Sequence, residues 1–392
     1  MEFIDLKAQH KRIEARIRER IDAVLEHGRF IMGPEIAELE KRLAERIGTR
    51  HCLTCASGTM ALELVLQAWD IGPGDALFTT PLTFIATSET IARTGATPVF
   101  VDISLQDYNL NAALLENAVR AVLTGDSSLH PLPEAARQKQ LRPKAIVAVD
   151  LFGHPADYGT LLSLADKYNL LVLEDGAQSY GGTYKDRPLC ACGCHAATTS
   201  FFPAKPLGCY GDGGAVFTDD DQLAALMDSL RYHGRVSPQN KNDNIRLGTN
   251  GRMDTLQAAI VLAKLEIFDE ELQARQTAAA RYADLLSGVT GLELPAPPAQ
   301  GLSTWAQYTV LLPERCDRER VMTGLKQSGI PTAINYPKSL HVQTAFQYLG
   351  YQTDDFPVAH MATGRVLSLP MHPYLDAETQ ARIASALVEN LA

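Results

Sequence analysis

Apolar residues recur every three or four positions in two stretches near the amino terminus. Residues 9–27 carry such a stripe at Ile13, Ile17, Ile21 and Val24, and residues 35–47 carry another at Ile36, Leu39, Leu43 and Ile47. This spacing places the apolar side chains on one face of a helix. The sequence therefore predicts two amphipathic helices with a turn over residues 28–34 between them.

Short apolar runs then alternate with helical patterns as far as residue 232. The predicted strands include residues 51–55, 76–80, 97–102, 144–150 and 170–173, and the predicted helices include residues 61–69, 158–167 and 219–232. Such alternation is typical of an α/β fold in which helices cover both faces of a mostly parallel sheet.

The last third of the chain has a pattern of its own. Helical residues 258–286 and a proline-rich stretch precede a strand at 308–312, a helix at 318–327, a strand at 366–373 and a helix at 377–391. We expect a large domain over residues 1–257 and a small carboxyl-terminal α/β domain over 258–392. Two polar segments, a surface insertion at 125–143 and a loop at 236–244, complete the prediction.

Composition narrows the functional classes. The chain has 392 residues, enough for a large and a small domain. A formal net charge of −10 argues against a nucleic-acid scaffold, and no apolar run is long enough to span a membrane. The first seven residues lack the apolar core of a signal peptide, so we expect a cytoplasmic protein with neither nucleic acid nor membrane as a partner.

Seven cysteines raise the question of a metal site. Cys52 and Cys55 have C-x-x-C spacing, and Cys190, Cys192 and Cys194 form a C-x-C-x-C run. A structural zinc site usually takes paired ligands from two knuckles, and the run does not have that spacing. We expect reduced thiols and no bound metal.

One lysine stands in an unusual loop. Pro203 and Pro206 flank Lys205, and glycines follow at positions 208, 211, 213 and 214. Prolines fix φ and glycines permit positive φ, so a rigid, irregular loop between two strands is expected. An amine confined in a partly apolar place can attack a carbonyl, which makes Lys205 a candidate for imine chemistry. A solvated lysine in a glycine-rich turn is the alternative.

A carboxylate precedes this loop in the sequence. Residues 170–173 predict a buried strand, and Asp175 follows at the end where parallel sheets bind ligands. Asp175, with Gln178 three residues later, could lie under the ring nitrogen of pyridoxal phosphate (PLP), which is an electron sink only while that nitrogen is protonated. An aspartate at a helix N-cap is an equally common arrangement.

Two further positions suit a phosphorylated, planar ligand. The turn Ser57-Gly58-Thr59 leads from a strand into a helix, whose free N–H groups could bind phosphate. The alternative is simple helix capping. The turn is neither G-x-G-x-x-G nor a Walker loop, which argues against dinucleotides and ATP. Phe84 could stack on a planar ring or fill the core.

Several segments together resemble signatures of the DegT/StrS-type nucleotide-sugar aminotransferases. They are residues 174–179 (Glu-Asp-Gly-Ala-Gln-Ser), 200–208, 211–215, 250–259 and 367–372. The resemblance covers nearly the whole chain. It implies PLP fold type I, the fold of aspartate aminotransferase, with a mostly parallel seven-stranded sheet in the large domain and a small carboxyl-terminal α/β domain.

The resemblance also implies roles for single residues. Lys205 would carry PLP through an imine, Asp175 would pair with the pyridinium nitrogen, and Gln178 would support the phenolic oxygen of the ring. Phe84 would stack on the ring. The phosphate contacts would come from Gly58, Thr59, Ser200 and, from the neighbouring subunit, Asn250.

Substrate contacts follow from the same resemblance. Arg252, also supplied by the neighbouring subunit, is similar to an arginine that meets the anionic sugar substrate. Tyr336 lies in the matching substrate loop. Close relatives have His-Tyr-Pro in that loop, whereas this chain has Asn335 before Tyr336, a difference that concerns substrate identity rather than cofactor chemistry.

The implied activity is transfer of an amino group from an amino acid, usually glutamate, to a UDP-linked keto sugar in a homodimer with shared active sites. Within the family, the chain resembles enzymes that aminate UDP-2-acetamido-2-deoxy-3-oxo-glucuronate for bacterial surface polysaccharide such as O-antigen. The alternative is a 4-aminotransferase for a nucleotide-linked 4-keto-6-deoxy sugar. A sugar dehydratase of this fold would have histidine in place of Lys205, and a PLP-binding regulator would need an attached DNA-binding module.

Overall fold

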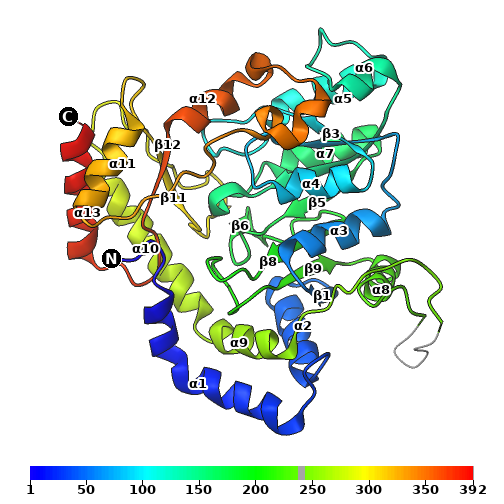
Figure 1. Cartoon of the computed structure of the whole chain (residues 1–392), viewed down its shortest axis with the longest axis horizontal. Helices are drawn as coiled ribbons and strands as arrows, with labels where there is room; N and C mark the ends of the chain where they lie inside the picture. The colour runs from blue at the N-terminus through cyan, green and yellow to red at the C-terminus, as the bar shows by residue number, and fades with distance from the viewer. Residues whose placement is uncertain (237–242, 392) are drawn as a thin grey trace.

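The computed structural model describes residues 1–236 and 243–391 (Figure 1). Most of the expected polar loop at 236–244 lies outside the described residues. The α-helices are α1 (Leu6–His27), α2 (Pro34–Ile47), α3 (Gly58–Ala68), α4 (Ala86–Arg93), α5 (Ala112–Thr124), α6 (Glu134–Gln138), α7 (Tyr158–Tyr168), α8 (Asp221–Leu230), α9 (Thr255–Leu265), α10 (Phe268–Leu286), α11 (Arg318–Gln327), α12 (Pro357–Arg365) and α13 (Ala377–Leu391). Short 3-10 helices are η1 (Leu151–Gly153), η2 (Leu340–Val342), η3 (Thr344–Leu349) and η4 (Thr353–Asp355).

The strands form one large and two small sheets. They are β1 (His51–Cys55), β2 (Asp75–Thr79), β3 (Thr97–Phe100), β4 (Arg142–Val149), β5 (Leu171–Asp175), β6 (Thr183–Tyr184), β7 (Arg187–Pro188), β8 (Ala196–Ser200), β9 (Gly214–Thr218), β10 (Gly301–Leu302), β11 (Tyr308–Leu311) and β12 (Val366–Leu369). The described strands of the large sheet have the order β1-β9-β8-β5-β4-β2-β3. β9 runs antiparallel to its two neighbours, β1 and β8, and the other neighbouring pairs are parallel, which confirms the predicted mostly parallel seven-stranded sheet.

Helices cover both faces of this sheet (Figure 1). Along β4, Ile146 and Ala148 pack in a core with α5 and α7. Ala145 and Val147 face the other way, into a core with α3 and α8. The alternation follows from the two-residue period of a strand, and burial on both faces explains why the central strands are continuously apolar.

The carboxyl ends of the central strands meet at one edge of the sheet. Val149 at the end of β4 is paired with Asp175 at the end of β5, which is paired with Thr198 in β8. The loops that follow these strands therefore lie side by side. This is the edge at which open parallel sheets bind ligands.

Another core lies beside the large sheet. The antiparallel pair β11–β12 packs with α10, α11 and α13 around buried residues that include Tyr282, Tyr308 and Leu387. Helix α9 belongs instead to the core that contains α2 and β9. The division into domains 1–257 and 258–392 stays a prediction.

The segment at 125–143, expected to be a surface insertion, is mostly exposed and is anchored by a few buried side chains. Leu132 and Ala136 are buried against the core beside α5. The His130 ring nitrogen Nε2 lies 2.7 Å from the Phe100 carbonyl oxygen. Leu132 lies just before the short helix α6 and Ala136 lies within it, so these two side chains anchor the segment to the core. Across residues 1–236 and 243–391, none of the helices has the length and apolar character needed to cross a membrane.

Candidate active site

Lys205 lies on a loop that joins β8 to β9 and closes on itself. The Phe201 carbonyl accepts a hydrogen bond from the Cys209 amide (2.7 Å), and the Lys205 amide donates to the Phe202 carbonyl (2.9 Å). A β-carbon at Gly208 would lie 2.6 Å from the Phe202 carbonyl oxygen, so no side chain fits there. The loop is irregular, as the prolines and glycines predict, and these contacts fix the backbone that carries Lys205.

The Lys205 amine is half-buried, and its charge interacts with that of Asp175 at the end of β5. Burial lowers the pKa of the Lys205 amine to about 8, although attraction to Asp175 acts in the opposite direction. A lysine with this pKa keeps a substantial neutral fraction near neutral pH, which nucleophilic attack on an aldehyde requires. The structure therefore places this amine and this carboxylate in one neighbourhood.

Asp175 is buried and held in a fixed orientation. The Thr87 hydroxyl donates to Oδ2 (2.8 Å), and the Ala177 amide donates to Oδ1 (3.3 Å). Burial raises the pKa of the Asp175 carboxyl, while the Thr87 hydrogen bond and the Lys205 charge lower it. Residues 177–181 form turns, so Asp175 is not the cap of a helix. A cation beside the carboxylate would offset the free-energy cost of burying its charge, and a protonated ring nitrogen is such a cation.

Gln178, Tyr336 and Phe84 lie near this carboxylate. The Gln178 oxygen Oε1 accepts from the Phe152 amide (2.8 Å), so Nε2 points to the Tyr336 hydroxyl, 3.5 Å away. The Phe84 ring centroid is 6.3 Å from that of Tyr336, and 55% of Phe84 is exposed. Exposure excludes the core alternative for Phe84 and leaves its ring available to a planar ligand.

Ser57, Gly58, Thr59 and Ser200 form what we call the phosphate cradle. Ser57 caps α3 by accepting from the Met60 amide (3.1 Å), and Gly58 and Thr59 begin the helix. A β-carbon at Gly58 would lie 2.7 Å from the β-carbon of Ser200. Helix capping and a ligand site are thus compatible, because the N–H groups of the first turn and the Ser200 hydroxyl border one small space.

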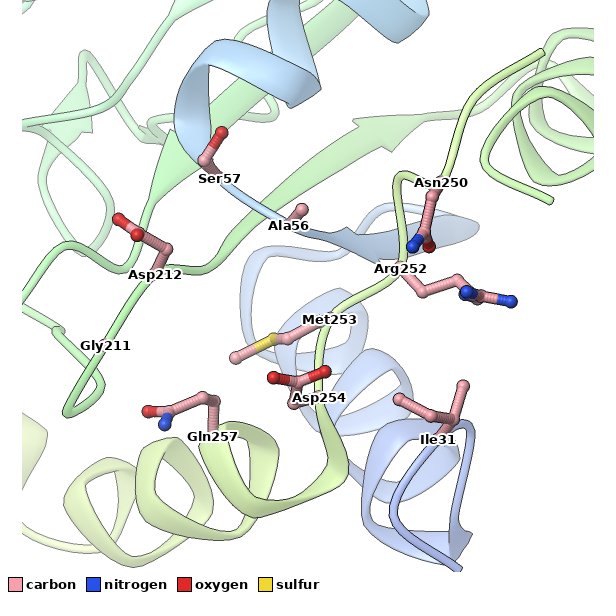
Figure 2. Close-up of a pocket in the computed structure, with 10 residues that line it drawn as sticks. All are labelled: Ile31, Ala56, Ser57, Gly211, Asp212, Asn250, Arg252, Met253, Asp254 and Gln257. Carbon is pink, nitrogen blue, oxygen red and sulfur yellow. The ribbon is translucent and has the colours of Figure 1, made fainter. Parts of the chain in front are cut away.

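Asn250 and Arg252 lie apart from Lys205 within the single chain. They line a cavity of about 580 Å³ together with Ser57, Asp212 and other residues, and Lys205 is not among its lining residues (Figure 2). Asn250 is exposed, and the Arg252 guanidinium points away from Ser57 in Figure 2. This placement is compatible with the expectation that Asn250 and Arg252 contact ligands bound in a neighbouring subunit.

The loop that contains Asn335 and Tyr336 is anchored to the two-stranded β11–β12 sheet. The Asn335 side-chain amide donates to the Ser368 hydroxyl in β12 (3.2 Å). Its neighbour Tyr336 instead reaches Gln178. The structure therefore places Tyr336 beside Gln178 and Phe84, whereas Asn335 contacts β12 instead.

Sequence reasoning missed two residues that orient the site. Thr87 holds the Asp175 carboxylate, and Phe152 presents the amide that orients Gln178. The signal for Thr87 was its position three residues after Phe84 in a polar stretch at the start of α4. Phe152 adopts a positive φ of 61°, and no residue type nearby marks this conformation.

Asp150 and Glu174 form a pair of buried acids on the opposite face of the sheet from Asp175. Asp150 accepts from the Ser179 hydroxyl (2.6 Å) and the Tyr158 hydroxyl (2.7 Å). Burial raises the pKa of Asp150 to about 6, and burial together with the Asp150 charge raises the pKa of Glu174. The two carboxyls interact, so their titration belongs to the pair rather than to either residue. The pair supports the strand that carries Asp175 without facing Lys205.

The cysteines do not assemble into a metal site in the part of the chain that the structure describes. Cys52, Cys55, Cys190, Cys192 and Cys209 are buried, and all seven thiols are free. Burial raises the pKa of these buried thiols, that of Cys55 to about 12. They are therefore poor nucleophiles in the folded protein.

The residues present suit pyridoxal phosphate. The phosphate cradle offers donors for an anion, and a β-carbon at Gly58 would fill it. Lys205 offers an amine of lowered pKa, Asp175 offers a buried carboxylate, and Gln178 offers an oriented amide donor. An aldehyde, a ring cation and a phenolic oxygen are the groups that these side chains could hold.

Comparisons with known proteins point the same way. Residues 11–388 match the model of the DegT/DnrJ/EryC1/StrS aminotransferase family. UDP-2-acetamido-2-deoxy-3-oxo-D-glucuronate aminotransferase of Pseudomonas aeruginosa is 44% identical over 387 residues, 99% of each chain. A DegT DnrJ EryC1 StrS aminotransferase structure from Brucella abortus is 43% identical with a TM-score of 0.90, covering 99% of this chain and 98% of that one. NtdA from Bacillus subtilis, solved with bound cofactor PMP, is 28% identical with a TM-score of 0.84, covering 99% and 83%.

Proposed function

We propose a substrate for this chain from the premise that it belongs to the DegT/DnrJ/EryC1/StrS aminotransferase family, has PLP fold type I and is an aminotransferase. With PLP as cofactor, it moves an amino group from L-glutamate to UDP-2-acetamido-2-deoxy-3-oxo-glucuronate. The observation that carries the chemistry is the Lys205 amine, whose pKa is lowered beside the buried Asp175. The sugar is proposed from the Pseudomonas relative, which matches over nearly its whole length.

The proposed chemistry divides among the residues of the site. When bound, PLP supplies an electron sink for the carbon that loses its proton. Lys205 takes that proton as a general base and returns it as a general acid, a role that its pKa of about 8 suits near neutral pH. Asp175 stabilises the ring cation, Gln178 donates to the phenolic oxygen, and the phosphate cradle holds the phosphate.

Two substrates use one site in turn, so we propose ping-pong kinetics. We also propose a homodimer in which Asn250 of the partner subunit adds a phosphate contact and Arg252 of the partner subunit meets the anionic sugar. The exposure of Asn250 and the direction of the Arg252 side chain, away from the Ser57 of its own chain, support this arrangement (Figure 2). The product would serve bacterial surface polysaccharide synthesis in the cytoplasm.

The test is a transaminase assay with a panel of acceptors. Protein, PLP and glutamate are mixed with the 3-oxo-glucuronate, its uncharged 3-keto analogue, or a nucleotide-linked 4-keto-6-deoxy sugar, and 2-oxoglutarate release is followed. We expect release with the 3-oxo-glucuronate and none from the Lys205→Ala variant. Release with the 4-keto sugar alone would establish the 4-aminotransferase alternative, and a colourless wild type that ignores PLP would overturn the cofactor assignment.

A further inference from the structure

Arg231 follows α8 as a buried cation and joins three elements. Its Nη1 donates to the Glu40 carboxylate of α2 (2.6 Å) and to the Thr54 carbonyl of β1 (2.6 Å), and its Nε donates to Asp228 of α8 (2.8 Å). Only 4% of Arg231 is exposed. Burial acts to lower the pKa of its guanidinium, but the charges of Glu40 and Asp228 raise it overall. The cation is therefore permanently charged and paired.

These contacts hold the end of β1 that leads into the phosphate cradle. Glu40 accepts hydrogen bonds from the Thr54 amide (2.8 Å) and the Thr54 hydroxyl (2.9 Å). Arg231 binds the carbonyl of the same residue. Both polar groups of the Thr54 backbone are thus fixed by one ion pair, three residues before Ser57.

The backbone of Arg231 holds the segment that carries Asn250 and Arg252. The Arg231 carbonyl accepts from the Gly251 amide (3.0 Å), and the Gly251 carbonyl accepts from the Ala56 amide (2.9 Å). Figure 2 shows Ala56 between Ser57 and this 250–252 segment. Gly251 is therefore bonded to Arg231 on one side and to the residue before the cradle on the other.

We propose that Arg231 is a positioning residue that links the phosphate cradle of its own subunit to the 250–252 segment, which serves the partner's site. The proposal rests on the proposed dimer with shared sites. The Arg231 side chain holds the strand end that leads into the cradle, and the Arg231 carbonyl holds the 250–252 segment. A displacement of either one therefore moves the other. Arg231 thereby couples the two active sites of the dimer, and the coupling is reciprocal.

The first experiment compares Arg231→Lys and Arg231→Met with a variant of a buried arginine that bonds neither the cradle nor the 250–252 segment. Lysine keeps the charge but cannot bind Glu40, Asp228 and Thr54 together. We expect PLP affinity, titrated by absorbance, to fall about tenfold or more in Arg231→Met and less in Arg231→Lys, as for other residues that orient ligand-binding groups. Arg275 is also 4% exposed and donates to the carbonyls of Trp305 and Met371. Arg275→Met should lower the Tm without changing PLP affinity.

The second experiment separates the two effects in mixed dimers with differently tagged subunits. One subunit carries Lys205→Ala, so only its partner has a working site. With Arg231→Lys in the subunit that keeps Lys205, PLP affinity should fall at that site. With Arg231→Lys in the Lys205→Ala subunit, the cradle of the working site is intact. The Asn250 and Arg252 that the variant subunit donates to that site shift. We then expect PLP affinity at the working site to fall, because the donated Asn250 contacts the phosphate. The KM for the UDP-sugar should rise about fivefold, in the usual range of coupling, with kcat within about twofold.

The outcomes are distinct. The dimer with Arg231→Lys in the Lys205→Ala subunit is compared with a dimer of Lys205→Ala and wild type. Equal KM and equal PLP affinity in the two dimers would overturn the coupling, as would a monomeric wild type. An equal loss of PLP affinity in Arg275→Met would show that Arg231 acts only through stability. If no keto sugar supports turnover in the wild type, the proposed function fails. The coupling is then judged by PLP affinity alone, because the partner's Asn250 also contacts the phosphate.

Discussion

At the scale of single residues, the pKa of the Lys205 amine sets how fast the apoprotein can capture an aldehyde. With a pKa of about 8, about a tenth of the amine is neutral at pH 7, roughly three-hundred-fold more than for an ordinary lysine. The rate of PLP capture should therefore rise with pH and reach half its maximum near pH 8. Stopped-flow absorbance from pH 6 to 10 measures this, and a midpoint above pH 10 would show a solvated lysine.

Gly58 offers a second prediction at this scale. In Gly58→Ala, the new β-carbon would lie 2.7 Å from that of Ser200, so the cradle must widen. We expect PLP affinity to fall about tenfold, since overpacking costs about 1–3 kcal/mol. Gly364→Ala is the matched control, because Gly364 lies in α12 with nothing within 4 Å of the added carbon. Equal PLP titration curves for wild type and Gly58→Ala would contradict the cradle.

At the scale of elements, α9 carries a buried lysine that has no role in the proposed mechanism. Lys264 is 1% exposed, and its amine lies 4.3 Å from the Tyr210 ring centroid. Burial lowers the pKa of Lys264 to about 8, although Glu271 acts to raise it. Below pH 8 the folded protein must therefore bury a charge. The unfolded chain binds more protons between about pH 8 and 10.5, so this destabilisation is relieved as pH rises through that window.

Lys264→Met should therefore stabilise the protein, by about 1–3 kcal/mol in the free energy of unfolding below pH 8. The gain should shrink by pH 10. Urea unfolding of the variant and the wild type at pH 7 and pH 10 measures both values. A loss of stability at pH 7 would mean that the contact with Tyr210 outweighs the desolvation of the amine.

The elements were largely predictable because their causes are local. The apolar stripes of α1 and α2 and the apolar runs of β4 and β5 each follow from a periodicity within one segment. The partial burial of residues 125–143 was not predictable, because it depends on a surface supplied by α5 and β3. The neighbours of Lys205 and Asp175 in the sequence marked these two residues as candidates. Thr87 was not predictable for the same reason as the burial of 125–143, because its contact with Asp175 forms only when α4 packs beside the end of β5.

At the scale of the whole molecule, the proposed dimer predicts complementation between inactive subunits. Lys205→Ala lacks the amine, and Arg252→Ala lacks the contact given to the partner. A mixed dimer of the two contains one complete site. After subunit exchange at equal concentrations, half of the dimers are mixed, so about a quarter of wild-type activity should return. Transaminase assays before and after mixing measure this, and no recovery would place Arg252 in its own subunit's site.

The buried thiols have a practical consequence for whoever handles the protein. A thiol-reactive dye cannot reach Cys52, Cys55, Cys190, Cys192 or Cys209 until the surrounding strands and loops separate. The half-buried Cys316 should react ahead of them. The slow phase of the dye reaction then measures how often the native state opens. Its signal does not depend on the absorbance of bound PLP.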